Sequence, residues 1–130
     1  MEAKELRDYF AHTVGFGVLA TADAQGRVNL AVYARPHVLE DGTLAMIMRD
    51  RLNHHNLQTN PHAAYLFRET GDGYRGRRLH LTKIAEERDS PRIAELKRRQ
   101  TTMLRETDPG PLFLVIFRVD RVMPLIGSGQ

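Results

Sequence analysis

The sequence predicts a mainly β domain in which six short antiparallel strands form a small closed barrel, with short helices inserted between them. Three observations support this fold class. Turn signals at residues 23–26 and 41–42 predict two consecutive hairpins, apolar segments of strand length recur along the chain, and the longest apolar run, Leu112–Phe117, is strand-sized. The 130 residues contain no internal repeat and no flexible linker, so we expect one domain over residues 1–130.

The first half of the chain is expected to supply four strands and two helices. Leu6, Phe10 and Val14 recur at helical spacing and predict an amphipathic helix before the first strand. Asp41-Gly42 favours a type I′ turn, which pairs residues 37–39 with the strand that follows. The expected elements are a helix over residues 4–14, strands over residues 16–22, 27–35, 43–49 and 62–67, and a short helix over residues 51–59 that Asp50 caps.

The second half is expected to add two strands and a longer helix. A glycine-rich loop at residues 71–76 precedes a strand over residues 79–86. Ser90-Pro91 is a typical helix start, and the helix extends to about Arg105. The last strand covers residues 112–119, and its continuous apolar character places it in the centre of the sheet or in an interface.

Composition excludes several classes of function. The chain has no cysteine, which excludes disulfides, thiolate catalysis, iron–sulfur clusters and cysteine-bound zinc. No apolar stretch approaches the roughly 20 residues of a membrane helix, and the N-terminal residues resemble no signal peptide, so we expect a cytoplasmic protein. With 19 basic and 16 acidic residues, the net charge of +3 favours nucleic acid no more than a phosphorylated small molecule.

The sequence contains no recognisable catalytic or metal-binding motif. Neither serine lies in a Gly-x-Ser-x-Gly turn, and the carboxylates lie beside lysines and arginines, as on solvated helix faces. His54 and His55 are adjacent on an expected helix and therefore point about 100° apart. We interpret them as structural or phosphate-facing residues rather than metal ligands, and we assign no catalytic residue.

The densest group of basic and polar residues lies at residues 48–55, where a strand is expected to end and a helix to begin. Amide groups at a helix N-terminus attract anions, and the arginine side chains of this segment suit a phosphate. Two interpretations stay open. The segment is a phosphate site, or it is a solvated arginine pair neutralised by Asp50, whose carboxylate would repel a phosphate placed too close.

Two stretches resemble the pyridoxamine 5′-phosphate oxidase-like, FMN-binding split-barrel family. Residues 15–28 are similar to its opening hairpin, and the strand at residues 44–48, the short helix, Asn56-Leu57 and residues 60–66 are similar to the pattern that follows. The resemblance covers nearly the whole chain. It implies a six-stranded antiparallel split β-barrel with short peripheral helices, paired as a homodimer, with an FMN in each of two clefts at the dimer interface.

The resemblance also implies cofactor contacts. The flavin ring would lie against the second and third strands, and the phosphate at the start of the short helix. The Arg-Lys pair that often binds phosphate in this family is replaced by Leu52 and Asn53. We therefore expect the positive charge to have moved by one residue to Arg51, supplemented by Arg49 or His54. The predicted cofactor-binding residues are Asn29, Ala31, Tyr33, Met46, Ile47, Met48, Arg49, Arg51, Asn53, His54 and, from the second subunit, Arg78.

We therefore predict a small FMN-dependent oxidoreductase that acts on a small-molecule substrate. Tyr33, Arg35 and Tyr74 are candidates for the substrate side of the flavin, but the oxidase's C-terminal substrate segment has no counterpart. The dimer is expected because apolar residues of the second and last strands are otherwise partly exposed. The glycine-rich loop is expected to be mobile until a ligand binds.

Two other functions compete with this prediction. The first is a non-catalytic binding module of the same fold that holds haem, a deazaflavin or stored flavin. Haem iron would then be bound by His54, His55 or His80. The second, less favoured, is a nucleic-acid binder that uses basic and aromatic residues of residues 74–78.

Overall fold

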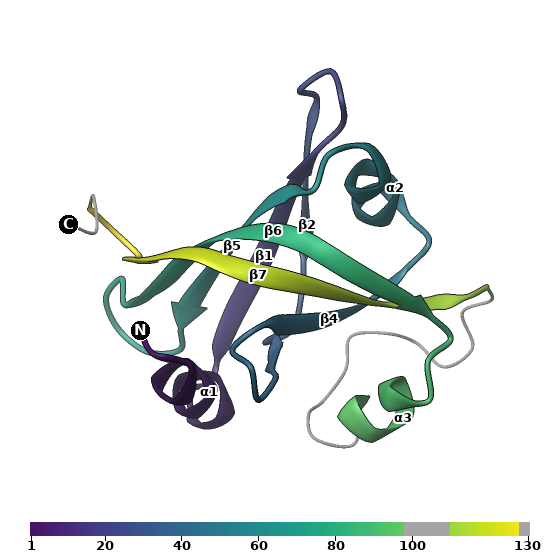
Figure 1. Ribbon diagram of the computed structural model, residues 1–130. Helices are drawn as coiled ribbons and strands as arrows, with labels where there is room; N and C mark the ends of the chain where they lie inside the picture. Colours follow the sequence, from purple (N-terminus) through teal and green to yellow (C-terminus); the bar gives the residue numbers. More distant parts are fainter. Residues whose placement is uncertain (98–109, 128–130) are drawn as a thin grey trace.

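Antiparallel hairpins organise the chain into one strongly curved sheet (Figure 1). The computed structural model describes residues 1–97 and 110–127. In these ranges the strand order is β2-β1-β5-β6-β7-β4-β3. The strands are β1 (Gly15–Ala22), β2 (Val28–Val32), β3 (His37–Val38), β4 (Leu44–Arg49), β5 (His62–Glu69), β6 (Gly76–Arg88) and β7 (Leu112–Pro124), and the helices are α1 (Ala3–His12), α2 (Leu52–Thr59) and α3 (Arg92–Lys97).

The sheet curls into a barrel that stays split between its two edge strands, β2 and β3. Its strand order begins with β2 and ends with β3, so the expectation of a fully closed barrel is wrong, whereas the split barrel is confirmed. The Tyr65 hydroxyl donates to the carbonyls of Tyr33 and Ala34 at 3.2 and 3.1 Å, which ties the segment after β2 to β5.

Residues 1–97 and 110–127 contain seven strands where six were predicted. The predicted strand over residues 27–35 ends at Val32, and residues 37–38 form the separate strand β3. Pro36 lies between them. Because proline has no N–H to donate to a ladder, it separates the two pairings.

Both early turns are confirmed, although the second is not of type I′. Gly26 and Gly42 have φ of +82° and +87°, the left-handed region that glycine adopts readily. Asp41 does not share this conformation. Its carboxylate instead accepts hydrogen bonds from the backbone N–H and the hydroxyl of Thr43, at 3.0 and 2.6 Å, which stabilises a longer loop.

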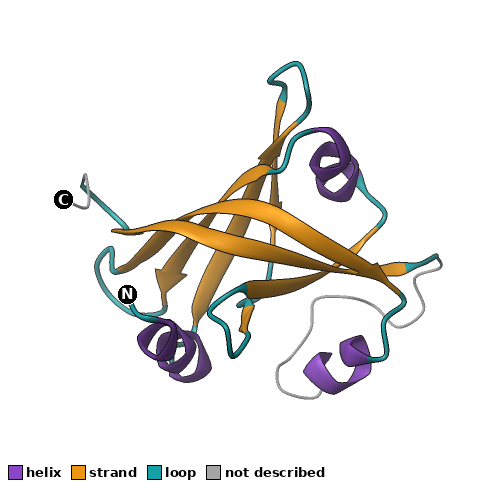
Figure 2. Ribbon diagram, viewed as in Figure 1, coloured by secondary structure: helices purple, strands orange, loops and turns teal. Residues whose placement is uncertain are grey.

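The paired strands β6 and β7 cross the barrel as its two longest elements and extend beyond the predicted ranges (Figure 2). Register shifts after His80 and after Lys83 bend β6 around the core. The side chains of Phe113–Phe117 are buried, which confirms a central last strand. The expectation that apolar residues of this strand are partly exposed is wrong for these five residues. The main core covers Phe113, Val115 and Phe117 on one face, and the cluster around α3 covers Leu114 on the other.

The helices cover the margins of the sheet. α1 places Leu6 and Phe10 in the main core, and α3 places Ile93 and Leu96 in a smaller cluster with Leu114. The expected continuation of α3 to Arg105 lies outside the described residues. None of the helices in the described ranges is long and apolar enough to cross a membrane.

Candidate ligand site

α2 follows β4 and lies between the β1–β2 hairpin and the far end of β6 (Figure 1). It begins at Leu52 with Arg51 as its N-cap, so the prediction that Asp50 caps the helix is wrong. The Arg51 side chain makes no capping hydrogen bond. The first backbone N–H groups of a helix have no acceptor within the helix, and they give this end a partial positive charge. The first turn of α2 can therefore attract an anion.

Asn53 attaches this first turn to the first two strands. It is buried, and its Oδ1 accepts hydrogen bonds from Thr21 Oγ1 at 2.5 Å and from Asn29 Nδ2 at 3.0 Å. One turn further along α2, Asn56 Nδ2 donates to the same Thr21 hydroxyl at 3.1 Å. A buried polar network of this kind fixes the rotation of the helix relative to β1 and β2.

Tyr33 and Arg51 complete the group around Asn53. Burial raises the pKa of Tyr33 to about 12, and the neighbouring Asn53 amide and Arg51 guanidinium partly offset that effect. The Asn53 Nδ2 makes no hydrogen bond of good geometry with the described residues. The structure thus brings together four residues that the sequence assigned to the cofactor: Asn29, Tyr33, Arg51 and Asn53.

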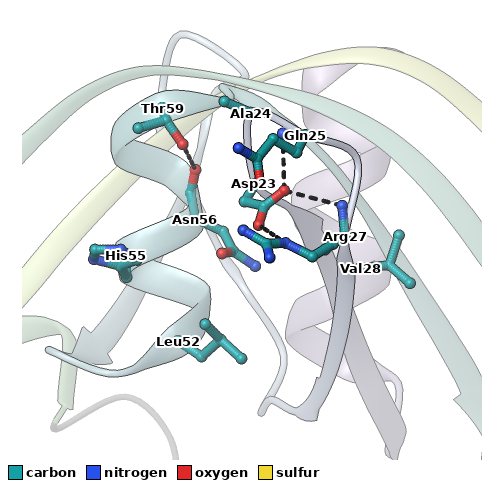
Figure 3. A pocket seen from close by; sticks show the side chains of 9 residues that line it. All are labelled: Asp23, Ala24, Gln25, Arg27, Val28, Leu52, His55, Asn56 and Thr59. Atoms are coloured by element: carbon teal, nitrogen blue, oxygen red, sulfur yellow. Dashed lines mark hydrogen bonds and ion pairs between the residues drawn. The ribbon is translucent and has the colours of Figure 1, made fainter.

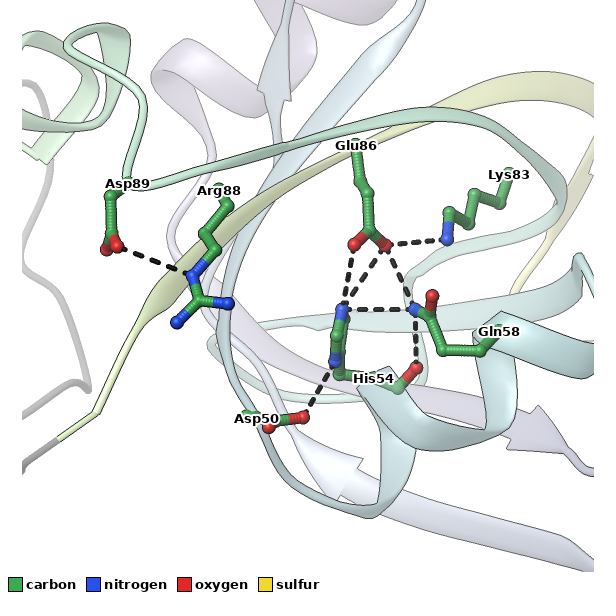
Figure 4. A network of polar contacts seen from close by, with 7 residues as sticks. All are labelled: Asp50, His54, Gln58, Lys83, Glu86, Arg88 and Asp89. Atoms are coloured by element: carbon green, nitrogen blue, oxygen red, sulfur yellow. Dashed lines mark hydrogen bonds and ion pairs between the residues drawn. The ribbon is translucent and has the colours of Figure 1, made fainter.

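His54 faces in a different direction, toward β6 and β7 (Figure 4). Its Nδ1 lies 3.0 Å from Asp50 Oδ1, and its Nε2 lies 3.1 Å from Glu86 Oε2. The imidazole stacks on Phe113 with 3.7 Å between ring centroids. His54 therefore joins the first turn of α2 to β6 and β7, whereas Asn53 joins it to β1 and β2.

Two of the four predicted contacts from β4 lie in the core. Met46 and Met48 belong to the main core and are 3% and 0% exposed, whereas Ile47 packs against the cluster around α3. Arg49 donates from Nη1 to the Gly110 carbonyl at 3.2 Å. The structure does not bring these side chains together with Asn53, and their contact with a flavin stays a prediction.

The remaining candidates are dispersed. Ala31 is half-buried on the same face of β2 as Asn29. Arg78 donates to the carbonyls of Pro124 and Gly127, near the start of β6 and far from α2. A contribution of Arg78 from a second subunit stays a prediction.

Three further candidates for a substrate or haem, Arg35, Tyr74 and His80, also lie apart from one another. Arg35 donates to the Thr13 carbonyl at 2.9 Å, and the guanidinium of Arg68 lies over the exposed Tyr74 ring. His80 is exposed on β6. None of these contacts assigns a substrate side.

A hollow of about 480 Å³ lies near the group around Asn53, between the β1–β2 turn and the outer face of α2 (Figure 3). An ion pair with 2.7 Å between Arg27 Nε and Asp23 Oδ2 forms one wall. Its lining residues are Asp23, Ala24, Gln25, Arg27, Val28, Leu52, His55, Asn56 and Thr59. The hollow extends the surface beside the first turn of α2.

Sequence reasoning missed Thr21, Asn56, Gln58 and Glu86. Thr21 occupies an inward position of an otherwise apolar strand, and Asn53 and Asn56 are three residues apart on one helix face, so these residues gave a usable signal. Glu86 gave none, because its contact with His54 joins residues 32 positions apart.

Comparisons with known proteins identify the fold. No family model and no curated protein matches the sequence. An FMN-binding protein from Syntrophomonas wolfei matches with a TM-score of 0.73 and 19% identity, covering 97% of this chain and 90% of that one. A candidate pyridoxamine 5′-phosphate oxidase from Lactobacillus delbrueckii matches with a TM-score of 0.62 and 16% identity, covering 92% and 91%. HutZ, the haem storage protein of Vibrio cholerae, matches with a TM-score of 0.65 and 19% identity, covering 95% of each chain.

Proposed function

Because the chain has the split-barrel fold of pyridoxamine 5′-phosphate oxidase-like proteins, we propose that it binds FMN, with the phosphate at the first turn of α2. One observation carries the proposal. Four polar side chains lie together at the first turn of α2, where the helix presents its unpaired N–H groups. They are Asn29, Tyr33, Arg51 and Asn53. The Arg51 guanidinium would pair with the phosphate charge, since its planar fork suits two phosphate oxygens.

The residues at this turn fit a phosphorylated ligand. Asn53 is held by Thr21 and Asn29 through Oδ1, which fixes the position of the first turn and of its backbone N–H groups. Asp50, whose charge opposes a phosphate, is directed at His54 Nδ1, which lies 3.0 Å from its Oδ1. Bound FMN supplies hydride or electron transfer between a donor and a small-molecule substrate. The protein's part is to hold the phosphate and to limit access to the ring.

The outer face of β2, β1 and β5 supports a homodimer. Strand register aligns Val32 with Val18 and Leu66, and it aligns Leu30 with Ala20 and Ala64. Val28 and Leu30 are 81% and 68% exposed, and Leu66 is 39% exposed. A contiguous apolar patch of this kind is typical of a protein interface, so we infer that a second copy covers it.

Arg78 lies at the margin of this apolar face. The register pairs it with Leu66, so its side chain belongs to the row that also contains Val18 and Val32. In a twofold dimer the residue therefore lies close to the second subunit. This position supports the proposal that Arg78 contributes to the partner's site.

Haem binding is the second candidate function. The likeness to HutZ supports it, and so does His80, which is exposed on the row of the outer face that contains Leu30 and Ala64. The absorbance spectrum of the purified protein separates the two candidates, because flavin gives two bands in the near-UV and blue whereas haem gives one dominant Soret band. Titration with FMN and riboflavin then tests the phosphate site. Equal affinity for the two flavins would reject it.

A further inference from the structure

Both ring nitrogens of the buried His54 face carboxylates. Nδ1 lies 3.0 Å from Asp50 Oδ1, and Nε2 lies 3.1 and 3.2 Å from the two oxygens of Glu86 (Figure 4). A carboxylate only accepts hydrogen bonds, and a neutral imidazole has only one N–H. The two contacts are satisfied together only when the ring carries two protons.

Gln58 does not remove this requirement. Its Nε2 lies 3.0 Å from His54 Nε2, but the same amide group has two other acceptors, Glu86 Oε1 and the His54 carbonyl, each at 3.0 Å. Those two acceptors use both of its N–H groups. If His54 Nε2 were unprotonated, its lone pair would face the Glu86 oxygens directly.

The charges around His54 balance when the ring is an imidazolium. The segment before α2 supplies Asp50, and β6 supplies Glu86 and Lys83, whose Nζ lies 2.6 Å from Glu86 Oε1. From β7 the ring meets the uncharged face of Phe113, and Arg88 lies 6.0 Å from that same ring and is paired with Asp89. A neutral His54 would leave this cluster with a net negative charge, beside the end of α2 that attracts anions.

We propose that His54 is a positioning residue for the phosphate-binding turn: as an imidazolium it holds the first turn of α2 against β6 and β7, and loss of its proton weakens the binding of a phosphorylated ligand. The proposal rests on the proposed function of this turn. Asn53 already fixes the turn to β1 and β2, so His54 supplies the second attachment. Its backbone N–H also belongs to the turn, so movement of the ring displaces a group that faces the anion.

The first test uses the ligand-free protein. Nitrogen-15 NMR of the imidazole is followed against pH, together with the backbone amides of residues 52–55. We expect two protonated ring nitrogens in His54 at low pH, and amide shifts that change with the same midpoint when the ring loses its proton. Glu86→Gln should move this midpoint to lower pH, because it removes one carboxylate acceptor. The proposal would be overturned if one ring nitrogen of His54 were unprotonated at every pH. It would also be overturned if the amide shifts of residues 52–55 did not change when the ring loses its proton.

The second test compares FMN with riboflavin as probes across the same pH range. The FMN phosphate gains negative charge as pH rises, which by itself strengthens binding to a cationic site. His54 acts in the opposite direction. In the wild type, we expect the ratio of FMN affinity to riboflavin affinity to fall by about fivefold or more as His54 loses its proton. In His54→Gln this fall should be absent. His62→Gln, which changes an exposed histidine of β5, should behave as the wild type.

The two tests separate the proposal from the function on which it rests. If the wild type never prefers FMN over riboflavin, the phosphate site is absent and the ligand part of the proposal falls with it. If the preference exists but His54→Gln and Glu86→Gln both follow the wild-type pH profile, only the role of His54 is rejected. Because Glu86→Gln retains the buried ring, the test stands even where His54→Gln does not fold.

Discussion

Asn53 and His54 are neighbours in the first turn of α2, yet they attach it to different parts of the sheet. The Asn53 Oδ1 accepts from Thr21 on β1 and Asn29 on β2, whereas His54 Nε2 lies 3.1 Å from Glu86 on β6. Consecutive helical residues point about 100° apart, so one turn of helix can reach both. The proposed phosphate site is thus built on a turn that is anchored on two sides.

The first prediction concerns the charge at this turn. Arg51→Ala should weaken FMN binding by about 10- to 100-fold, because it removes a charge-assisted hydrogen bond to the phosphate. Riboflavin binding should stay nearly unchanged, since riboflavin has no phosphate. Fluorescence titration with both flavins measures this. Arg118→Ala is the matched control, because it removes one exposed arginine that is paired with Asp120 on β7. Equal losses for both flavins would indicate a folding defect instead.

The second prediction concerns the anchor formed by Asn53. Asn53→Ala should lower the free energy of unfolding by about 2 kcal/mol, because the buried Thr21 hydroxyl and Asn29 amide lose their shared acceptor. Chemical denaturation followed by circular dichroism gives the value. His55→Ala, on the exposed side of the same turn, should change it by less than about 0.5 kcal/mol. Similar losses in the two variants would mean that the network contributes little.

The sequence predicted the strands well because their signals are local. Alternating apolar residues and the turns at Gly26 and Gly42 define hairpins without reference to the rest of the chain. Pro36 is also a local signal for a strand break. It was not used in the prediction, so one strand was counted where the structure has β2 and β3. Asp50 was predicted as the N-cap of α2 because aspartate is a common capping residue. In the structure its carboxylate instead contacts His54 Nδ1, and Arg51 is the N-cap.

The site was predicted only in part. Four of the predicted residues, Asn29, Tyr33, Arg51 and Asn53, lie together, since hairpin pairing and a short helix determine their positions. Their contact with a cofactor stays a prediction. The contacts that depend on distant parts of the chain could not be read from sequence. His54 meets Glu86 because β6 bends at two register shifts, and nothing local to either residue predicts those shifts.

The third prediction concerns the space that Gly17 provides. A Cβ at this position would collide with the Tyr65 hydroxyl and would lie 2.6 Å from the Tyr33 carbonyl oxygen. Gly17→Ala should therefore displace the Tyr65 hydrogen bonds that tie the segment after β2 to β5, and lower the free energy of unfolding by about 2–3 kcal/mol. In a Tyr65→Phe background the same substitution should cost less, because the contact with the hydroxyl, the shortest of the three, is gone, while those with Cζ of the ring at 2.5 Å and with the Tyr33 carbonyl remain. A double-mutant cycle with no coupling would contradict this.

The fourth prediction concerns stability in acid. Burial favours the neutral form of Glu86, but hydrogen bonds from Gln58, Lys83 and His54 outweigh it and lower the pKa of Glu86 to about 2. A carboxylate with a lowered pKa stabilises the fold above its unfolded value of about 4.5, and this contribution is lost as pH falls toward 2. Glu86→Gln should therefore flatten the fall in unfolding free energy between pH 4.5 and 2. Glu40→Gln, at an exposed position, should leave it steep.

The last prediction concerns the apolar outer face. Leu30 is 68% exposed in the middle of β2, in the row that continues through Ala20 and Ala64. Leu30→Glu would place a charge at the centre of the proposed interface, where the second copy would have to desolvate it. We expect the wild type to sediment as a dimer at micromolar concentration and the variant as a folded monomer, with the dimer dissociation constant raised by about 100-fold or more. Ile84→Glu, an exposed apolar residue of β6 outside the rows of this face, should stay dimeric. A wild-type monomer that binds FMN with full affinity would show that one subunit forms the site alone, and Arg78 would then have no role across an interface.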